Sequence, residues 1–167
     1  MTEEPMVMPR IHLQPAAAVV TDKPTMVHTV LGSCVAVTMR VARLGLAAAA
    51  HCLLPNAGAP AAALEEAEAL RFVDTTIELM LGDFTRRGAS LQEIEVKLFG
   101  GADNMGEGGY QVGSRNVEAA LAALAASGTM PAASSVGGTH GRTIDFNTAT
   151  GEVAVRRLPM RGARRPA

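Results

Sequence analysis

The chain has 167 residues, 48% of them hydrophobic, and a formal net charge of −1 at pH 7. This length suits one domain that buries a core without metal or disulfide support, and the near-neutral charge argues against a general nucleic-acid binder, which normally has a basic surface. Two cysteines are too few for a disulfide framework, and no segment resembles a signal peptide, so we expect a protein of the reducing cytoplasm.

The predicted elements begin after an N-terminal tail. Residues 1–14 contain two prolines and no hydrophobic periodicity, so we expect them to be poorly ordered. A single domain then covers residues 15–160. Its first strand is predicted over residues 16–20 and its second over residues 27–31, with a turn between them.

A predicted β-hairpin carries the two residues of greatest chemical interest. A small-residue turn, Gly32-Ser33, leads to Cys34 at the head of an alternating apolar run, and a second apolar run leads to His51. Residues 41–45 between the two runs carry the charge and the glycine that are expected where a hairpin turns. The hairpin therefore brings a thiol and an imidazole back toward each other.

The register of this hairpin decides how closely the two side chains meet. If the turn is centred between Ala42 and Arg43, Cys34 lies opposite His51, with the Cβ atoms roughly 4.5–5.5 Å apart. A slip by one residue would instead place Cys52 opposite Cys34 and turn His51 to the other face. We favour the first register because the slip leaves His51 without a role. In that register Cys52 points to the opposite face and is a core residue rather than a catalytic one.

Both residues also have a simpler interpretation. A lone cysteine is commonly a small buried hydrophobe, and a lone histidine among alanines is commonly a hydrogen-bonded core residue. The hairpin spacing favours a nucleophile and base pair, as in thiol hydrolases, but does not decide between the two interpretations.

The middle of the chain predicts two long helices. An alanine-rich segment follows the hairpin, and its prolines and glycine exclude a membrane span. Apolar residues at helical spacing then predict a helix over residues 61–87, with Gly88 as its C-cap. A second helix is expected to begin at Ser114 as N-cap and to end at Gly128.

Strands surround these helices, which indicates an α/β sandwich (α+β type) of mostly antiparallel strands rather than a doubly wound sheet. The further predicted strands cover residues 94–99, 131–136, 143–146 and 153–158, with a glycine-rich loop at 102–113 and a basic tail at 161–167. No run matches a phosphate loop or a dinucleotide fingerprint. The histidines His12, His28 and His140 are too scattered to predict a metal site, and we expect no cofactor.

Four stretches resemble the CheD family of chemoreceptor glutamine deamidases, in the order that the family has them. They are LGSCVAV with AHCLLP at 31–37 and 50–55, KLFGGADNM at 97–105, VGSRNVEAALAAL at 112–124 and VGGTHGR at 136–142. The resemblance implies a cysteine hydrolase that converts glutamine side chains of methyl-accepting chemotaxis receptors to glutamate. It also implies binding to a CheC-type chemotaxis phosphatase.

The chemistry that the resemblance implies fits the hairpin residues. Cys34, as a thiolate beside His51, would attack the side-chain amide, and protonated His51 would release ammonia. His51 would then activate water to hydrolyse the thioester. The N–H groups of the Gly32-Ser33-Cys34 turn are candidate oxyanion donors, although these residues could equally form only a tight turn.

Family members also use a threonine shortly before the cysteine, and Thr29 is the candidate. In an unbroken strand His28, rather than Thr29, would share the face of Cys34. A bulge near Gly32 would reverse this, so Thr29 is the preferred third residue and His28 the reserve. Thr29 could equally be an ordinary strand residue.

Two other functions remain open at this point. One is another thiol acyl-transfer enzyme, such as a peptidase or a transglutaminase, and the other is a non-catalytic adaptor that binds a CheC-type phosphatase. Further residues in the family-like stretches have no assignable chemistry from sequence, namely Gly100, Gly101, Asn104, Arg115, Asn116 and Arg142.

Overall fold

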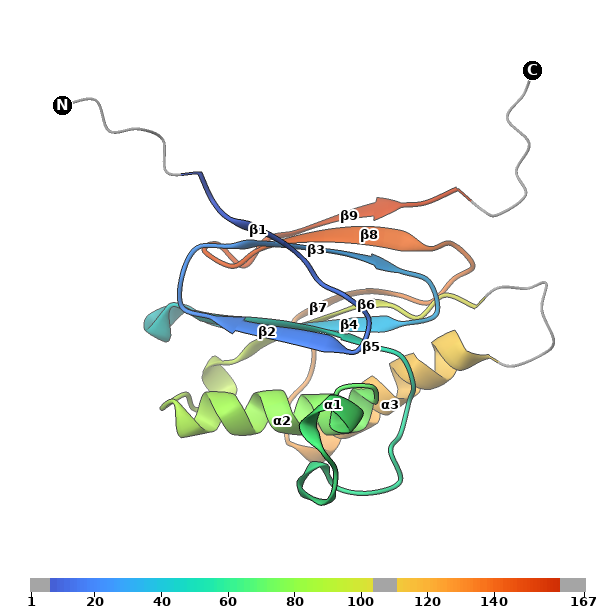
Figure 1. Cartoon of the computed structure of the whole chain (residues 1–167), viewed down its shortest axis with the longest axis horizontal. Helices are drawn as coiled ribbons and strands as arrows, with labels where there is room; N and C mark the ends of the chain where they lie inside the picture. Colours follow the sequence, from blue (N-terminus) through green and yellow to red (C-terminus); the bar gives the residue numbers. More distant parts are fainter. Residues whose placement is uncertain (1–6, 104–110, 160–167) are drawn as a thin grey trace.

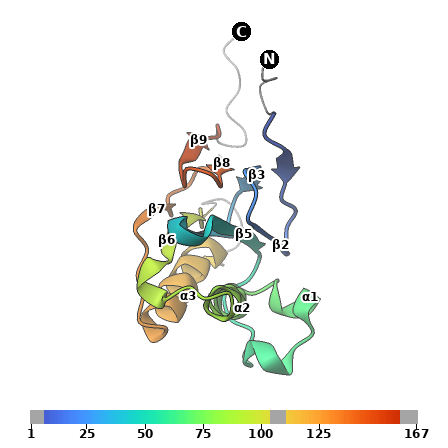
Figure 2. The same cartoon turned by 90° about the vertical axis from the view of Figure 1, so that its left-hand side faces the viewer.

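The computed structural model of the chain describes residues 7–103 and 111–159, which form three layers (Figure 1). A four-stranded sheet lies on one side, a five-stranded sheet in the middle and the helices on the other side. A view turned by 90° shows the same order of layers (Figure 2). The predicted sandwich of mostly antiparallel strands with two long helices is confirmed.

Two sheets and three α-helices make up these layers. The four-stranded sheet has the order β1 (Arg10–His12), β3 (Met26–Leu31), β8 (Arg142–Asn147), β9 (Val153–Arg157). The five-stranded sheet has the order β2 (Ala17–Thr21), β5 (Leu46–Cys52), β4 (Val35–Val41), β6 (Glu95–Gly100), β7 (Ala133–Val136). The helices are α1 (Glu66–Ala69), α2 (Val73–Arg86) and α3 (Val112–Ala126), with single 3₁₀ turns at Ala42–Leu44, Ala61–Ala63 and Leu91–Glu93.

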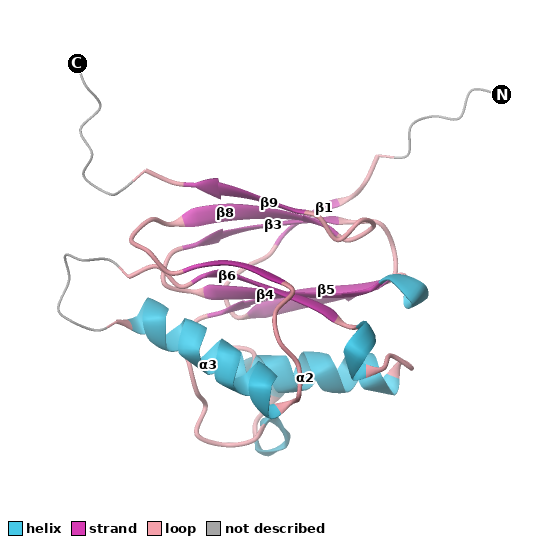
Figure 3. Ribbon diagram, turned by 180° about the vertical axis from the view of Figure 1, so that it is seen from behind, coloured by secondary structure: helices cyan, strands magenta, loops and turns pink. Residues whose placement is uncertain are grey.

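The central strands β4 and β5 are buried on both faces. One face packs against α2 and α3, which lie together under the five-stranded sheet (Figure 3). The other face packs against the inner residues of the four-stranded sheet, such as Val27 and Phe146. Because both faces are buried, β5 is an almost continuous run of small apolar residues, broken only by His51. Among the described residues, His51 is the one histidine that is buried, and it lies between the two sheets.

The N-terminal segment is more ordered than its sequence predicts. Residues 10–12 form β1, which pairs in parallel with β3, although we expected a poorly ordered tail there. Leu13 buries its side chain between the sheets, and its N–H donates to the carbonyl of His28 at 2.8 Å. A strand of three residues is too short to show a periodicity, so the sequence gives no sign of it. Residues 1–6 and the predicted basic tail lie outside the described residues.

The predicted helix over residues 61–87 is broken into a 3₁₀ turn, α1 and α2. Phe72 is extended (φ −109°, ψ 139°) and forms an isolated bridge with Leu54, and the N–H of Val73 donates to the carbonyl of Leu54 at 2.8 Å. Pairing with a distant segment thus overrides the local helical pattern. From Val73 onward the predicted spacing holds, and Gly88 follows the helix end with φ +97°.

The second helix begins two residues before the predicted N-cap. Ser114 lies inside the first turn of α3, where its N–H and hydroxyl both donate to the carboxylate of Asp103. The carboxylate of the preceding loop therefore does the capping that we assigned to Ser114. Among the described residues, no helix has the length and apolar character needed to cross a bilayer.

Candidate active site

The β4–β5 hairpin forms as predicted, but its register differs from the predicted one by two residues. Ala36 pairs with His51 and Val35 with Cys52, so the prediction that Cys34 lies directly opposite His51 is wrong. The cause is the connection, a 3₁₀ turn over Ala42–Leu44 closed by a glycine with φ +60°. This turn moves the centre of the hairpin by one residue.

A shift of two residues preserves the faces of both strands. Cys34, just before β4, packs against the inter-sheet cluster that includes Leu31 and Ile144, and His51 also points between the sheets. Cys52 points to the opposite side, into the core that β5 shares with α2 and α3, and is fully buried there. The predicted division therefore holds: Cys34 and His51 share one face and Cys52 faces the other.

His51 is held by a short chain of hydrogen bonds. Its Nδ1 lies 2.7 Å from Oγ1 of Thr29, and the same Oγ1 lies 2.8 Å from the carbonyl oxygen of Leu13. A carbonyl can only accept, so the threonine hydroxyl donates to Leu13 and Nδ1–H of His51 donates to the threonine. This assignment leaves the lone pair of His51 on Nε2.

The Nε2 atom of His51 is buried and has no hydrogen-bond partner among the described residues. Burial lowers the pKa of His51 below its ordinary value, because the interior disfavours the charged imidazolium. His51 is therefore a neutral imidazole at pH 7, with its basic nitrogen unoccupied. This is the state that a general base needs.

Cys34 is half-buried at the exposed Gly32-Ser33 turn. Burial raises the pKa of its thiol, and its own backbone N–H partly opposes the shift. Within residues 7–103 and 111–159 no hydrogen bond joins Cys34 to His51. The free protein thus holds a neutral thiol and a neutral imidazole, whereas we expected a thiolate. Hydrogen bonds between catalytic groups often tighten only when a substrate is bound.

Thr29 reaches His51 because β3 and β4 belong to different sheets. The inward side chains of β3 include Thr29, which is 3% exposed, whereas His28 points to the outer face and bonds Asp145 at 2.9 Å. Counting faces along one unbroken strand favours His28, and we expected a bulge near Gly32 to reverse this. The actual cause is that Gly32-Ser33 carries the chain from one sheet to the other. His28 makes no hydrogen bond with His51.

The turn that carries Cys34 is fixed through its carbonyl groups. Each carbonyl accepts one hydrogen bond, Gly32 from the N–H of Ala102 at 3.0 Å, Ser33 from Nδ2 of Asn116 at 2.9 Å and Cys34 from the N–H of Gly101 at 2.9 Å. Among the described residues, the N–H groups of Ser33 and Cys34 donate to no backbone carbonyl. Both groups lie beside the thiol and are donors that an oxyanion could use.

A family model described as CheD chemotactic sensory transduction matches residues 53–157. The chain belongs to the CheD family. The resemblance seen in the four sequence stretches is thereby confirmed.

Curated relatives extend the CheD match to most of the chain. A Geobacter sulfurreducens protein named "Probable chemoreceptor glutamine deamidase CheD 2" is 44% identical, over 90% of this chain and 91% of the relative. A relative from Oleidesulfovibrio alaskensis is 42% identical, over 90% of this chain and 74% of its own. The "Chemoreceptor glutamine deamidase CheD" of Thermotoga maritima is 34% identical, over 84% of this chain and 87% of its own.

Gly100 and Gly101, to which the sequence alone assigned no role, contact the Cys34 turn of this CheD chain. Gly100 has φ +101°, and a Cβ added there would lie 2.2 Å from the carbonyl oxygen of Cys34. Gly101 has φ +68°, and its added Cβ would lie 2.3 Å from the side chain of Val117. Only glycine combines this backbone conformation with so close an approach. The glycine pair was visible in the sequence, but its partner across the fold was not.

We predict that Gly100→Ala destabilises the protein by about 2–5 kcal/mol, from the left-handed backbone and the backbone clash together. Gly45→Ala is the matched control, because Gly45 has φ +60° with no atom within 4 Å of an added Cβ, and should cost only about 1–2 kcal/mol. Chemical denaturation measures both values. Equal losses of stability in the two variants would contradict the close approach at Cys34.

The other residues of the CheD stretches to which the sequence assigned no role differ in burial and in their contacts. Arg142 is buried, and its guanidinium donates to the carbonyls of Ser135 and Gly137, which ties β8 to the end of β7. Burial lowers the pKa of Arg142, and the nearby Arg157 adds to this. Arg115 is exposed on α3, and Asn104 lies outside the described residues. Asn116 contacts the Cys34 turn directly.

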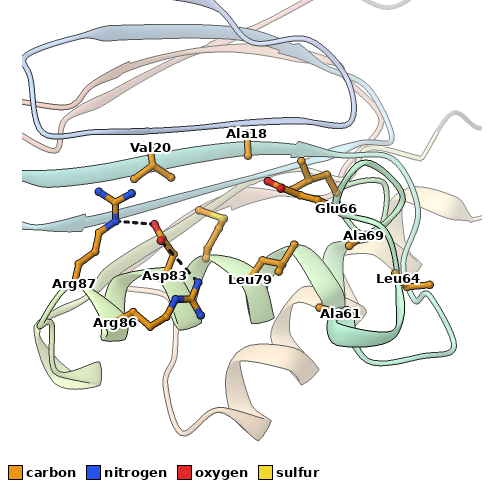
Figure 4. Close-up of a pocket in the computed structure, with 12 residues that line it drawn as sticks. Ala18, Val20, Ala61, Leu64, Glu66, Ala69, Leu79, Asp83, Arg86 and Arg87 are labelled. Carbon is orange, nitrogen blue, oxygen red and sulfur yellow. Dashed lines mark hydrogen bonds and ion pairs between the residues drawn. The ribbon is translucent and has the colours of Figure 1, made fainter.

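Two cavities of this CheD structure differ in the side chains that line them. A cavity of about 260 Å³ adjoins Thr29 and His51 and is also lined by His12 and His28. A second, of about 440 Å³, lies between β2, α1 and α2 and contains Asp83 paired with Arg86 and Arg87 (Figure 4). The second cavity contains no cysteine or histidine, and its titratable side chains are those of Glu66, Asp83, Arg86 and Arg87. The described residues contain no group of three or more metal-ligating side chains.

Proposed function

We propose that this protein is a chemoreceptor glutamine deamidase, which hydrolyses glutamine side chains of methyl-accepting chemotaxis receptors to glutamate and releases ammonia. The names of the CheD relatives support this activity. The observation that carries the proposal is the chain of hydrogen bonds from His51 through Thr29 to the carbonyl of Leu13, which leaves a buried, unpaired Nε2 on the face of Cys34.

The first half of the reaction forms a thioester. Nε2 of His51 accepts the thiol proton as Sγ of Cys34 attacks the side-chain carbonyl carbon of the substrate glutamine. The carbonyl oxygen becomes an oxyanion, which the N–H groups of Ser33 and Cys34 stabilise. The imidazolium then gives its proton to the leaving nitrogen, and the C–N bond breaks to release ammonia.

The second half of the reaction hydrolyses the thioester. Water enters where ammonia left, and Nε2 of His51 accepts its proton during attack on the thioester carbon. The C–S bond breaks, the imidazolium returns its proton to the sulfur, and the product is glutamate. Thr29 holds the imidazole ring through Nδ1, so that Nε2 faces the reacting atoms in both halves.

The surroundings of Cys34 support a protein substrate rather than free glutamine. The cysteine packs against Leu31, Ala36, Phe99 and Ile144, and these side chains offer no partner for a free α-amino group or α-carboxylate. A glutamine presented on a receptor helix has its backbone groups already paired, so only its side chain must enter. The substrate helices of a chemoreceptor lie in the cytoplasm, so we place the protein there.

We also propose a CheC-type phosphatase as a partner. The family resemblance implies this binding, and a non-catalytic adaptor would need only that contact. Chemotaxis retained by cells that carry Cys34→Ala in place of the native protein would favour the adaptor. Another thiol acyl-transfer enzyme would cleave or cross-link peptide chains rather than release ammonia from side chains.

The test compares three substrates at equal glutamine concentration: free glutamine, an unfolded glutamine peptide and an intact receptor cytoplasmic domain. We expect ammonia release from the receptor domain to be far faster than from the other two. Mass spectrometry should show conversion of single glutamines to glutamate without peptide cleavage, and Cys34→Ala should serve as the blank. Comparable rates on all three substrates would indicate a general glutaminase instead.

A further inference from the structure

Asn116 on α3 joins the two segments that carry the reacting groups. Its side chain is 0% exposed, and its Nδ2 donates to the carbonyl of Ser33 at 2.9 Å and to the carbonyl of Leu53 at 3.1 Å. Ser33 immediately precedes the nucleophile, and Leu53 follows the end of β5, two residues after His51. A single amide group therefore links the Cys34 turn to the strand that carries the base.

This link stands where the ladder between β4 and β5 ends. Val35 and Cys52 are the last paired residues, and continuation of the ladder would place Cys34 opposite Leu53. Instead, the N–H of Leu53 donates to the carbonyl of Arg71 at 2.9 Å, and the amide of Asn116 fills the gap. The strands β4 and β5 separate at this point. On the β6 side the carbonyl of Cys34 accepts from the N–H of Gly101, whereas the N–H of Cys34 donates to no backbone carbonyl among the described residues.

The geometry of the peptide bond then fixes the direction of that N–H group. In a trans peptide the C=O and N–H groups point in opposite directions, and none of the described residues has a cis bond. The carbonyl of Ser33 points to Asn116, so the N–H of Cys34 in the same peptide points away from α3. We infer that Asn116 is a positioning residue that orients the Cys34 N–H to stabilise the oxyanion of the acyl-transfer step.

Two further observations support this role. Both hydrogens of Nδ2 are used, and Oδ1 of Asn116 is buried with no partner among the described residues. An unsatisfied buried acceptor is unfavourable, so the two donated hydrogen bonds are what an asparagine contributes here.

The fold brings α3 unusually close to the turn. Gly113, in the first turn of α3, would place an added Cβ 2.4 Å from the carbonyl oxygen of Ala102, and Ala102 itself donates to Gly32. The absence of a side chain at Gly113 lets the helix contact this backbone directly. Asn116, one turn later, is thereby within reach of the carbonyl of Ser33.

The inference rests on the proposed function, because an oxyanion forms only in acyl transfer, but its test does not need a receptor. Two small probes are applied to purified protein, with Cys34→Ala as the blank for each. p-Nitrophenyl acetate acylates a thiol through a tetrahedral oxyanion, whereas iodoacetamide alkylates it by displacement without one. Receptor deamidation, measured separately, decides the proposed function.

We expect Asn116→Ala to slow acylation of Cys34 by about ten- to a hundredfold, which does not exceed the smallest effect of removing one oxyanion donor outright, about a hundredfold. Alkylation should stay within about twofold of wild type. Asn116→Asp, which keeps the volume, should show the same split and replaces the alanine variant if that one does not fold. Leu124→Ala, fully buried on the same helix and remote from the turn, is the control for destabilisation and should leave both rates near wild type. Parallel loss of both rates in the Asn116 variants, or loss of neither, would overturn the inference.

Discussion

Cys34→Ala and Cys34→Ser should each lower receptor deamidation by at least about three orders of magnitude, the scale of losing a nucleophile. Alanine has no group to attack the amide carbon. Serine keeps a hydroxyl, but His51 would have to remove a proton that is held far more tightly than that of a thiol. Ammonia release from a receptor domain measures the loss, and both variants should fold because Cys34 is only half-buried at a turn.

Cys52→Ala is the matched control for the nucleophile. Cys52 is fully buried, and burial raises its pKa to about 12, so it is neither accessible nor ionised at neutral pH. Its replacement should cost about 1 kcal/mol of stability and leave most of the activity. Iodoacetamide should label Cys34 first, and faster at higher pH, because the raised pKa keeps the thiol protonated at neutral pH. A folded but inactive Cys52→Ala protein would overturn the assignment of Cys34.

His51→Ala and His51→Asn should lower turnover by about two to four orders of magnitude, the usual contribution of acid–base catalysis. The imidazole takes the thiol proton and later protonates the leaving nitrogen, and asparagine can do neither. Near-wild-type turnover in His51→Asn would remove His51 from the mechanism and direct attention to His28. The stability of both variants, measured by denaturation, separates lost chemistry from lost folding.

The pH profile of the wild-type enzyme gives a second readout for His51. Burial lowers the pKa of His51 below its ordinary value of 6.5, so the imidazole becomes protonated at a lower pH than an ordinary histidine does. The rate should therefore fall on the acid side with a midpoint below pH 6.5, as the imidazole becomes protonated. In His51→Asn the remaining rate should lose this acid limb. If the rate of His51→Asn fell at the same pH as that of the wild type, the acid limb would belong to another group.

The sequence predicted the chemical pair because alternation in strands is a local property. The apolar runs around Cys34 and His51 fix which side of each strand a residue takes, and an error of two residues in register leaves the sides unchanged. The same local signal located α2 from Val73 onward, most strands and the glycine that ends the helix. The four family-like stretches depend only on the order of residues, and the CheD match confirms them.

What the sequence by itself determined is therefore the family, the sandwich of strands and helices, and the common face of Cys34 and His51. Only the tertiary structure decided the contacts between segments far apart in the chain. Thr29 meets His51 because the chain crosses between two sheets at Gly32-Ser33, and face counting along one strand contains no information about such a crossing. Asn116 and Gly100 meet the Cys34 turn from positions more than sixty residues away. Such contacts form when layers pack, and no local periodicity records which residues the packing brings together.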